Sequence, residues 1–220
     1  MSNATRAARA CQSSLPVSDE LGVRYPVAEL FCTLQGEGAH TGRAAVFVRT
    51  GGCDVGCPWC DSPSAQTTRG CRMMTAEEIV NEVAGFKADM TVITGGEPLI
   101  HDLTPLTAEL ERAGRYVALE TSGTHRLSGR FDWICVSPKR FARPSEGMLS
   151  AASELKVVIS GEEDFAFAEE CAAECVPGCR LSLQPEWGVR ERVTPAIIAY
   201  IKEHPQWRLS LQTHKFIDIP

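Results

Sequence analysis

The sequence predicts an α/β fold built around a largely parallel sheet. Two observations predict it: apolar, β-branched runs recur along the chain, and helical patterns stand between them. Such alternation is typical of parallel strands joined by crossover helices, in a sheet that is either open or curved into a barrel. About six core strands fit the chain where eight would close a barrel, so we expect a partial, TIM-type barrel with an open side.

The expected strands are short and apolar, and the first of them follows a glycine-rich segment. Their ranges are 44–49, 90–94, 116–121, 133–136, 155–159, 180–184 and 208–212. Helices are expected over 75–86, 103–113, 163–175 and 194–204. The first helix has a capping box, because Thr75 stands three residues before Glu78.

Size and charge narrow the class of protein. The chain has 220 residues, of which 44% are hydrophobic, which suits one domain over 23–220. Residues 1–22 lack the apolar segment of a signal peptide, and we expect a flexible extension there. No run of 18 apolar residues predicts a membrane span, and the net charge of −6 argues against direct nucleic-acid binding. A small-molecule or protein partner is favoured.

Polar residues follow four of the expected strands. Ligands of parallel sheets bind at the carboxyl ends of the strands, so these segments are the expected site. They are 94–97, 120–122, 137–139 and 184–185. In the first of them, glycines allow a ligand to approach the backbone closely.

Three cysteines, Cys53, Cys57 and Cys60, follow the first expected strand within eight residues. Three is an odd number for disulfides, and a structural zinc site would need a fourth ligand such as Cys71 or His40. The C-x3-C-x2-C spacing instead suits three corners of an iron–sulfur cube, with the fourth iron open to a ligand. Ten cysteines without an export signal also favour reduced thiols or metal ligation over disulfides.

The cysteine loop CDVGCPWC resembles that of the radical S-adenosylmethionine (SAM) enzymes. Over roughly residues 25–220, a collinear set of motifs resembles the 7-carboxy-7-deazaguanine synthases of that superfamily: TLQGEG, AVFVRTGGC, CPWCDS, TGGEP, ETSGT, SPK and QTHKFIDIP. The resemblance implies a 4Fe-4S cluster whose open iron binds SAM, and a 5′-deoxyadenosyl radical that abstracts hydrogen from the substrate. It also implies the partial barrel.

The implied reaction is a ring contraction in queuosine and 7-deazapurine biosynthesis. The substrate would be 6-carboxy-5,6,7,8-tetrahydropterin, with hydrogen abstraction at C6, loss of ammonia and formation of 7-carboxy-7-deazaguanine. Such an enzyme is a carbon–nitrogen lyase, and we assign no protein side chain as its acid or base. The resemblance further implies a homodimer, a reducing partner such as flavodoxin, and a cytoplasmic location.

The resemblance also implies which residues hold the cofactors. The cluster ligands would be Cys53, Cys57 and Cys60. The SAM contacts would be Trp59, Cys60, Asp61, Gly96, Glu97, Ser137, Pro138, Lys139 and Gln184. Ser62 stands where the family usually has threonine, and its hydroxyl would help to bind a magnesium ion beside the substrate carboxylate.

Substrate contacts are implied at both ends of the chain. They are Leu34, Gln35, Gly36, Glu37, Arg49, Thr94, His214 and Pro220. Gln35 and Glu37 offer hydrogen bonds to a pterin edge, and Arg49 can bind a carboxylate with two N–H groups. The terminal carboxylate of Pro220 would accept hydrogen bonds from the pterin. The alternatives are a surface ion pair for Arg49 and a docked apolar last strand for the tail.

Two other functions remain open at this stage. Another radical SAM enzyme, such as a glycyl-radical activase, would share the cysteine loop but act on a protein. A zinc-binding module without enzymatic activity would lack the brown colour of an iron–sulfur protein. A second cluster on Cys171, Cys175 and Cys179 is disfavoured, because Pro177 and Gly178 end the helix and buried cysteines pack well without metal.

Overall fold

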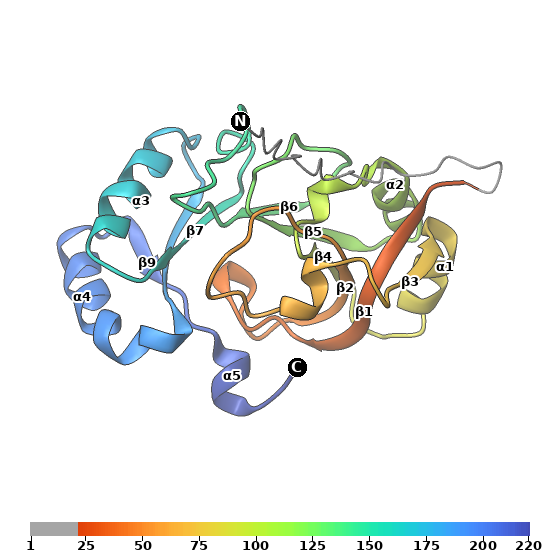
Figure 1. Ribbon diagram of the computed structural model, residues 1–220, viewed down its shortest axis with the longest axis horizontal. Coiled ribbons are helices and arrows are strands. Elements are labelled where there is room, and N and C mark those ends of the chain that lie inside the picture. The colour runs from red at the N-terminus through yellow and green to blue at the C-terminus, as the bar shows by residue number, and fades with distance from the viewer. Residues whose placement is uncertain (1–21) are drawn as a thin grey trace, which may run out of the picture.

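A computed structural model describes residues 22–220, and these form one nine-stranded sheet with helices against it (Figure 1). The expected extension over residues 1–22 lies outside the described part, apart from Gly22. The strand order is β3-β1-β2-β4-β5-β6-β7-β8-β9. The strands from β2 to β9, β3 excepted, pair in parallel, whereas β1 is antiparallel to both β2 and β3. The outer strands do not pair with each other, so the expected partial barrel is confirmed.

The strands are β1 (Arg24–Leu34), β2 (Ala44–Thr50), β3 (Arg72–Thr75), β4 (Met90–Gly95), β5 (Tyr116–Thr121), β6 (Trp133–Val136), β7 (Glu154–Ile159), β8 (Arg180–Pro185) and β9 (Trp207–Leu209). The α-helices are α1 (Ala76–Val83), α2 (Thr104–Arg112), α3 (Glu163–Ala173), α4 (Arg190–Glu203) and α5 (Thr213–Ile217). Short 3-10 helices are η1 (Gly38–His40), η2 (Pro63–Gln66), η3 (Pro98–Ile100) and η4 (Trp187–Val189).

The capping box of α1 forms as expected. The Thr75 hydroxyl accepts a hydrogen bond from Glu78 N at 3.2 Å, and Thr75 N donates to the Glu78 carboxylate at 2.7 Å. Two donors that a helix start leaves free are therefore satisfied. Helix α4 begins four residues before its expected start and includes Pro195.

β1 and β3 were not expected. Pro26 interrupts the apolar pattern of β1, and the pairing of β1 with β2 shifts register between Val27 and Glu29. A proline and a bulge weaken the periodic signal of a strand. Because β1 runs antiparallel to β2, with Leu34 opposite Ala44, the segment that follows β1 begins beside the amino end of β2, and the Gln35 side chain reaches Glu120 on β5.

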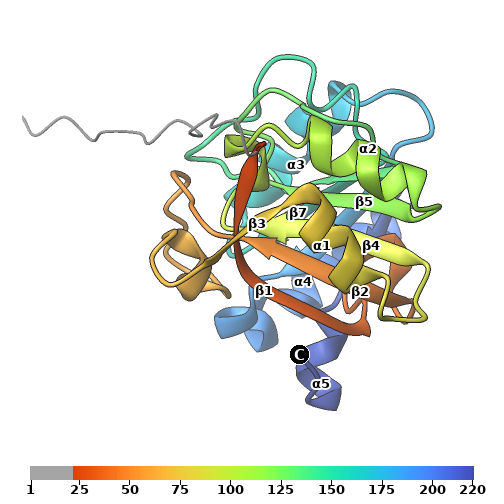
Figure 2. The same ribbon diagram turned by 90° about the vertical axis from the view of Figure 1, so that its right-hand side faces the viewer.

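The helices cover the outer face of the curved sheet. Figures 1 and 2 show α1 and α2 beside β1, β3, β4 and β5, and α3 and α4 beside β7, β8 and β9. In the described residues, the connections from β5 to β6 and from β6 to β7 contain no helix, so the β/α repetition is incomplete there. The parallel strands number seven, β2 and β4 to β9, one for each expected strand range, so the sheet has one parallel strand more than the estimate of about six core strands.

Alternation along β2 separates the two faces of the sheet. Val46 and Val48 belong to the large core beneath the helices, whereas Ala45 and Phe47 belong to a small apolar cluster inside the barrel. Successive side chains of a strand point to opposite faces, so Arg49 follows Ala45 and Phe47 on the inner face. The inner face is thus apolar at the amino end of β2 and polar at its carboxyl end.

Candidate active site

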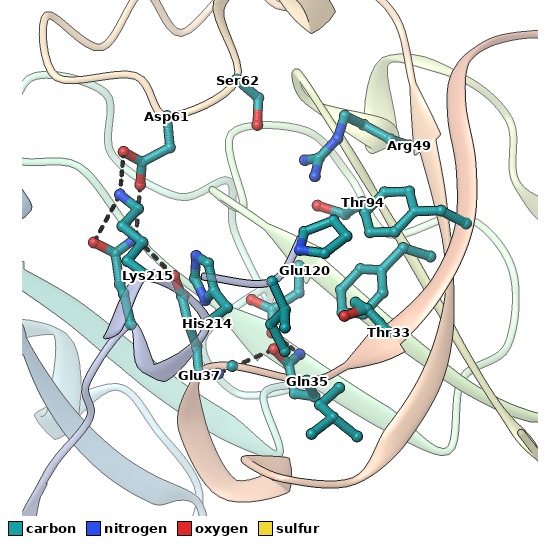
Figure 3. Close-up of a pocket in the computed structure, with 17 residues that line it drawn as sticks. Thr33, Gln35, Glu37, Arg49, Asp61, Ser62, Thr94, Glu120, His214 and Lys215 are labelled. Atoms are coloured by element: carbon teal, nitrogen blue, oxygen red, sulfur yellow. Dashed lines mark hydrogen bonds and ion pairs between the residues drawn. The ribbon is translucent and has the colours of Figure 1, made fainter. Parts of the chain in front are cut away.

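The inner face becomes polar toward the carboxyl end on the neighbouring strands as well. On β4, Thr94 follows Met90 and Val92 at two-residue steps; on β5, Glu120 follows Ala118. The polar residues therefore gather at one end of the barrel because each parallel strand reaches that end on the same face. Figure 3 shows Arg49, Thr94 and Glu120 around one space.

Two adjoining cavities occupy this end of the barrel. The larger, of about 370 Å³, is bounded by the C-terminal segment and is called the tail cavity. The smaller, of about 230 Å³, contains the three-cysteine loop and is called the cysteine cavity. Both are lined by a shared set of residues: Glu37, Arg49, Asp61, Ser62, Thr94, Glu120 and Gln212.

The cysteine cavity is lined by Cys53, Cys57 and Cys60, all free thiols and half-buried. Burial raises the pKa of Cys57, with Cys53 and Cys60 adding to the effect and Lys139 opposing it. Among residues 22–220, no three His, Cys, Asp or Glu side chains converge as ligands of a single metal ion. A cube binds each thiolate through a different iron and needs no such convergence, so the three thiols fit a cluster better than zinc.

Most residues expected to contact SAM line the cysteine cavity. They are Trp59, Cys60, Asp61, Gly96, Ser137, Lys139 and Gln184. Lys139 Nζ donates to the backbone oxygen and the hydroxyl of Ser137 at 2.7 and 2.8 Å. Burial lowers the pKa of Lys139. Pro138 and Glu97 do not line this cavity.

Glu97 is fully buried, and its carboxylate is hydrogen-bonded to other groups of the protein. It accepts hydrogen bonds from the Thr121 hydroxyl at 2.6 Å and from Ser122 N at 2.8 Å, and also from Leu99 N at 3.0 Å. The preceding Gly96 packs against the cysteine loop: a Cβ there would lie 2.4 Å from Gly52 O. The GGE segment therefore holds the cysteine loop and the segment after β5 in place.

The tail cavity is lined by every residue expected to contact substrate: Leu34, Gln35, Gly36, Glu37, Arg49, Thr94, His214 and Pro220. Arg49 Nε is paired with Glu29 at 2.7 Å, and Figure 3 shows its guanidinium pointing into the cavity. The expected surface ion pair and the expected cavity position are thus both present. Gly36 lies against the His214 ring, where a Cβ would be 2.1 Å from Nδ1.

A buried ion-pair network lies between the cavities. Lys156 Nζ, on a side chain that is 4% exposed, is 2.6 Å from Glu37 Oε2 and 2.9 Å from Glu120 Oε2. Gln35 donates to Glu120 at 3.3 Å, and Gln212 donates to Glu37 at 2.9 Å. Such a charge is tolerated in an interior only when it is paired and hydrogen-bonded.

The network sets opposite pKa shifts on its two carboxyl groups. Burial raises the pKa of Glu37, but the Lys156 ammonium and hydrogen bonds to the carboxylate outweigh it and lower the pKa to about 2. For Glu120, burial dominates and, with the Glu37 charge added, the pKa is raised despite Lys156. Burial also lowers the pKa of His214, so its imidazole is neutral at pH 7.

Sequence reasoning missed three members of this site. Lys156 and Gln212 were assigned no role, and Glu120 was noted only as a polar strand end. The signal for Lys156 was a charged residue inside the apolar run LKVVI, whose burial requires an acidic partner. Nothing in the local sequence of Gln212 indicates its contacts with Glu37 and Asp61.

The remaining sequence candidates lie as follows. Ser62 precedes η2, lines both cavities and makes no side-chain cap there. Cys171 is buried in the core, and Cys175 and Cys179 pack against it, in agreement with the packing interpretation. The tail forms helix α5, followed by residues 218–220, instead of a docked strand. Among residues 22–220, every helix is too short or too polar to cross a membrane.

Comparisons with known proteins show similarity in both sequence and fold. Residues 47–135 match the model of the radical SAM superfamily. The 7-carboxy-7-deazaguanine synthase of a Synechocystis strain is 49% identical over 93% of this chain and 98% of its own length, and that of Escherichia coli K12 is 36% identical over 90% and 100%. The crystal structure of QueE from Escherichia coli superimposes with a TM-score of 0.77 at 34% identity, covering 87% of this chain and 95% of that one.

Proposed function

The chain belongs to the 7-carboxy-7-deazaguanine synthases of the radical SAM superfamily, and from this premise we propose how its two cavities divide the reaction. The cysteine cavity holds the 4Fe-4S cluster and SAM that the superfamily uses. The tail cavity holds 6-carboxy-5,6,7,8-tetrahydropterin, which is converted to 7-carboxy-7-deazaguanine with loss of ammonia. The observation that supports this division is the set of seven residues common to both linings.

In the cysteine cavity, the thiolates of Cys53, Cys57 and Cys60 hold the cluster. The cluster and SAM, when bound, supply the radical that abstracts a hydrogen atom. Lys139 and Ser137 are already hydrogen-bonded to each other, and they present a preformed polar edge to SAM. Gln184, Gly96, Trp59 and Asp61 complete that lining, whereas Glu97 acts through the loops it holds.

In the tail cavity, polar groups suit both ends of the substrate. Arg49 uses its Nε on Glu29, so its terminal N–H groups remain to bind the substrate carboxylate. The Pro220 carboxylate and the neutral imidazole of His214 offer acceptors, and His214 also offers one donor, for the pterin edge. A cavity of about 370 Å³ is within the usual range for a ligand of this size.

Glu37 and Gln35, in the lining of the tail cavity, position the pterin. Glu37 is held ionised by Lys156, and its N–H donates to Gln35 Oε1 at 3.1 Å. Both side chains are therefore fixed before substrate binds, which lowers the entropic cost of binding. Leu34, Gly36 and Thr94 supply the rest of the wall.

A magnesium ion at Ser62 would join the two halves of the site. Ser62 lines both cavities, and Figure 3 shows its hydroxyl and the Arg49 guanidinium facing the same space. Mg²⁺ keeps several waters and needs few protein ligands, so one hydroxyl together with a substrate carboxylate suffices. The ion would stabilise charge on the carboxylate during rearrangement.

The wider setting of the enzyme is part of the same proposal. It acts in the cytoplasm in queuosine biosynthesis, as a homodimer that receives electrons from a reductant such as flavodoxin. A reducing compartment suits free thiols at the site.

The proposal is tested by anaerobic reconstitution with iron and sulfide, followed by SAM, Mg²⁺, reductant and the pterin. Mass spectrometry should detect 7-carboxy-7-deazaguanine, and serine substitution of Cys53, Cys57 or Cys60 should abolish it. If SAM is cleaved slowly to 5′-deoxyadenosine without any deazapurine, the substrate assignment is wrong. If no cluster assembles, the cofactor assignment is wrong as well. Omitting Mg²⁺ tests the role of Ser62.

A further inference from the structure

Helix α5 covers the tail cavity without a core of its own. None of its five residues is buried, and Phe216 and Ile217 are 60% and 58% exposed. A helix this short is not stable alone. Its position over the cavity therefore depends on contacts between its side chains and other parts of the chain.

Those contacts are mainly polar and converge on the cysteine loop. Asp61, directly after Cys60, accepts from Lys215 Nζ at 2.7 Å and from Gln212 Nε2 at 2.6 Å, one bond to each carboxylate oxygen (Figure 3). Lys215 also donates to Gln212 at 3.1 Å. One carboxylate thus fixes both the start of the tail and the first turn of α5.

A second set of contacts orients the helix and does not involve the cysteine loop. The Lys215 ammonium lies 4.9 Å from the centre of the Trp187 ring, and Phe216 packs edge-on against the same ring. Thr213 bonds to Gly36 O through both its N–H and its hydroxyl. Lys215 takes part in both sets of contacts, because it contacts Asp61 on the cysteine loop and Trp187 in η4.

The chain turns back into the cavity after α5. Asp218 ends the helix in the left-handed conformation, at φ 53°, and Ile219 N bonds to His214 O at 3.2 Å. Ile219 and Pro220 then line the tail cavity. The position of the terminal carboxylate is therefore determined by α5, and the position of α5 depends on Asp61.

We propose that Asp61 and Lys215 form a positioning pair, which couples order in the cysteine loop to closure of the C-terminal segment over substrate. The idea rests on the proposed function in naming what each of the two cavities binds. Cofactor binding holds the loop, the loop holds Asp61, and Asp61 holds α5 and the terminal carboxylate. Coupling between sites is reciprocal, so substrate binding under the tail must also order the loop.

Hydrogen–deuterium exchange on the anaerobically reconstituted protein tests the coupling without measuring activity. Lys215→Met keeps the aliphatic length but removes the charge. We expect backbone amides of both 213–220 and 54–62 to exchange about three- to tenfold faster than in the wild type, as expected for loss of one partly solvent-exposed hydrogen bond. Asp61→Asn should give the same two-sided pattern.

The matched control is Asp89→Asn, which removes the carboxylate of an exposed ion pair with Arg43 at 3.0 Å, outside the lining of both cavities. It should leave both peptides unchanged. Faster exchange confined to 213–220 in Lys215→Met, or unchanged exchange in both peptides, would overturn the coupling. Iron content and visible absorbance show whether the Asp61→Asn protein has lost its cluster. If it has, the exchange of Lys215→Met alone tests the coupling.

Steady-state kinetics then distinguish a positioning role of Lys215 from a general loss of active-site structure. In Lys215→Met, we expect KM for the pterin to rise about tenfold and KM for SAM to rise by a smaller factor, and more 5′-deoxyadenosine to be released per product formed. Equal changes in both KM values would contradict the assignment. Product formation by the wild type tests the proposed function separately, because the exchange experiment does not require turnover.

Discussion

Two charged residues on β7 lie two positions apart on the inner face of the barrel and have different roles. Glu154 is 1% exposed, and within residues 22–220 its carboxylate accepts from Ala39 N at 3.0 Å and from the Ser182 hydroxyl at 2.7 Å. Lys156 is 3% exposed, pairs with two acids and lines the cysteine cavity. Both are paired or hydrogen-bonded, but of the two only Lys156 lines a cavity.

The difference follows from position along the strand. The amino end of the barrel is filled by η1 and by a cluster of Tyr116, Trp133 and His40, with His40 4.7 Å from the Trp133 ring. The carboxyl end carries both cavities. A buried charge near the filled end stabilises the fold, whereas one near the open end also arranges the site.

The largest expected effect is that of Lys156→Met. It leaves Glu37 and Glu120 without their buried cation, so we expect the free energy of unfolding to fall by about 3–5 kcal/mol and product formation to be lost. Chemical denaturation of the apo protein measures the first and mass spectrometry the second. The triple variant Lys156→Met, Glu37→Gln, Glu120→Gln should recover most stability but no activity. Recovered activity would remove Lys156 from the site.

An acid titration should show a smaller effect, traced to Glu37. Its pKa in the folded protein is about 2 against an ordinary 4.5, so its stabilisation is complete above pH 4.5 and is lost as pH falls toward 2. The shift corresponds to about 3 kcal/mol, and the side chain is only 19% exposed. Glu37→Gln should flatten this part of the stability curve. An unchanged curve would show that Glu37 is not held ionised.

The smallest effect is expected at the filled end. Glu154→Gln replaces one accepting oxygen by a donor, so one of its two hydrogen bonds is lost, at about 1–2 kcal/mol in unfolding free energy. Product formation per mole of cluster should remain at the wild-type level. A large loss of activity at unchanged cluster content would contradict the separation of the two ends.

The parallel strands of the sheet could be predicted from the sequence, because each buried strand is recognised by its own apolar run, without knowledge of its distant partners. β1 escaped prediction because Pro26 and a bulge disturb its pattern. β3 escaped prediction because it is an edge strand, RMMT, that lacks a buried apolar run. The motif residues of the site were predicted through resemblance. Lys156 was missed because its partner Glu37 is 119 residues away in sequence, and no local pattern encodes such a pair.

The central claim is that SAM in the cysteine cavity adjoins the pterin in the tail cavity. It is tested most directly with a pterin carrying deuterium at C6, turned over anaerobically by the reconstituted enzyme. We predict that deuterium appears in 5′-deoxyadenosine and recovered SAM, as measured by mass spectrometry. Product formed with no deuterium in either molecule would show that hydrogen is not abstracted from C6, and would contradict the assignment of the two cavities.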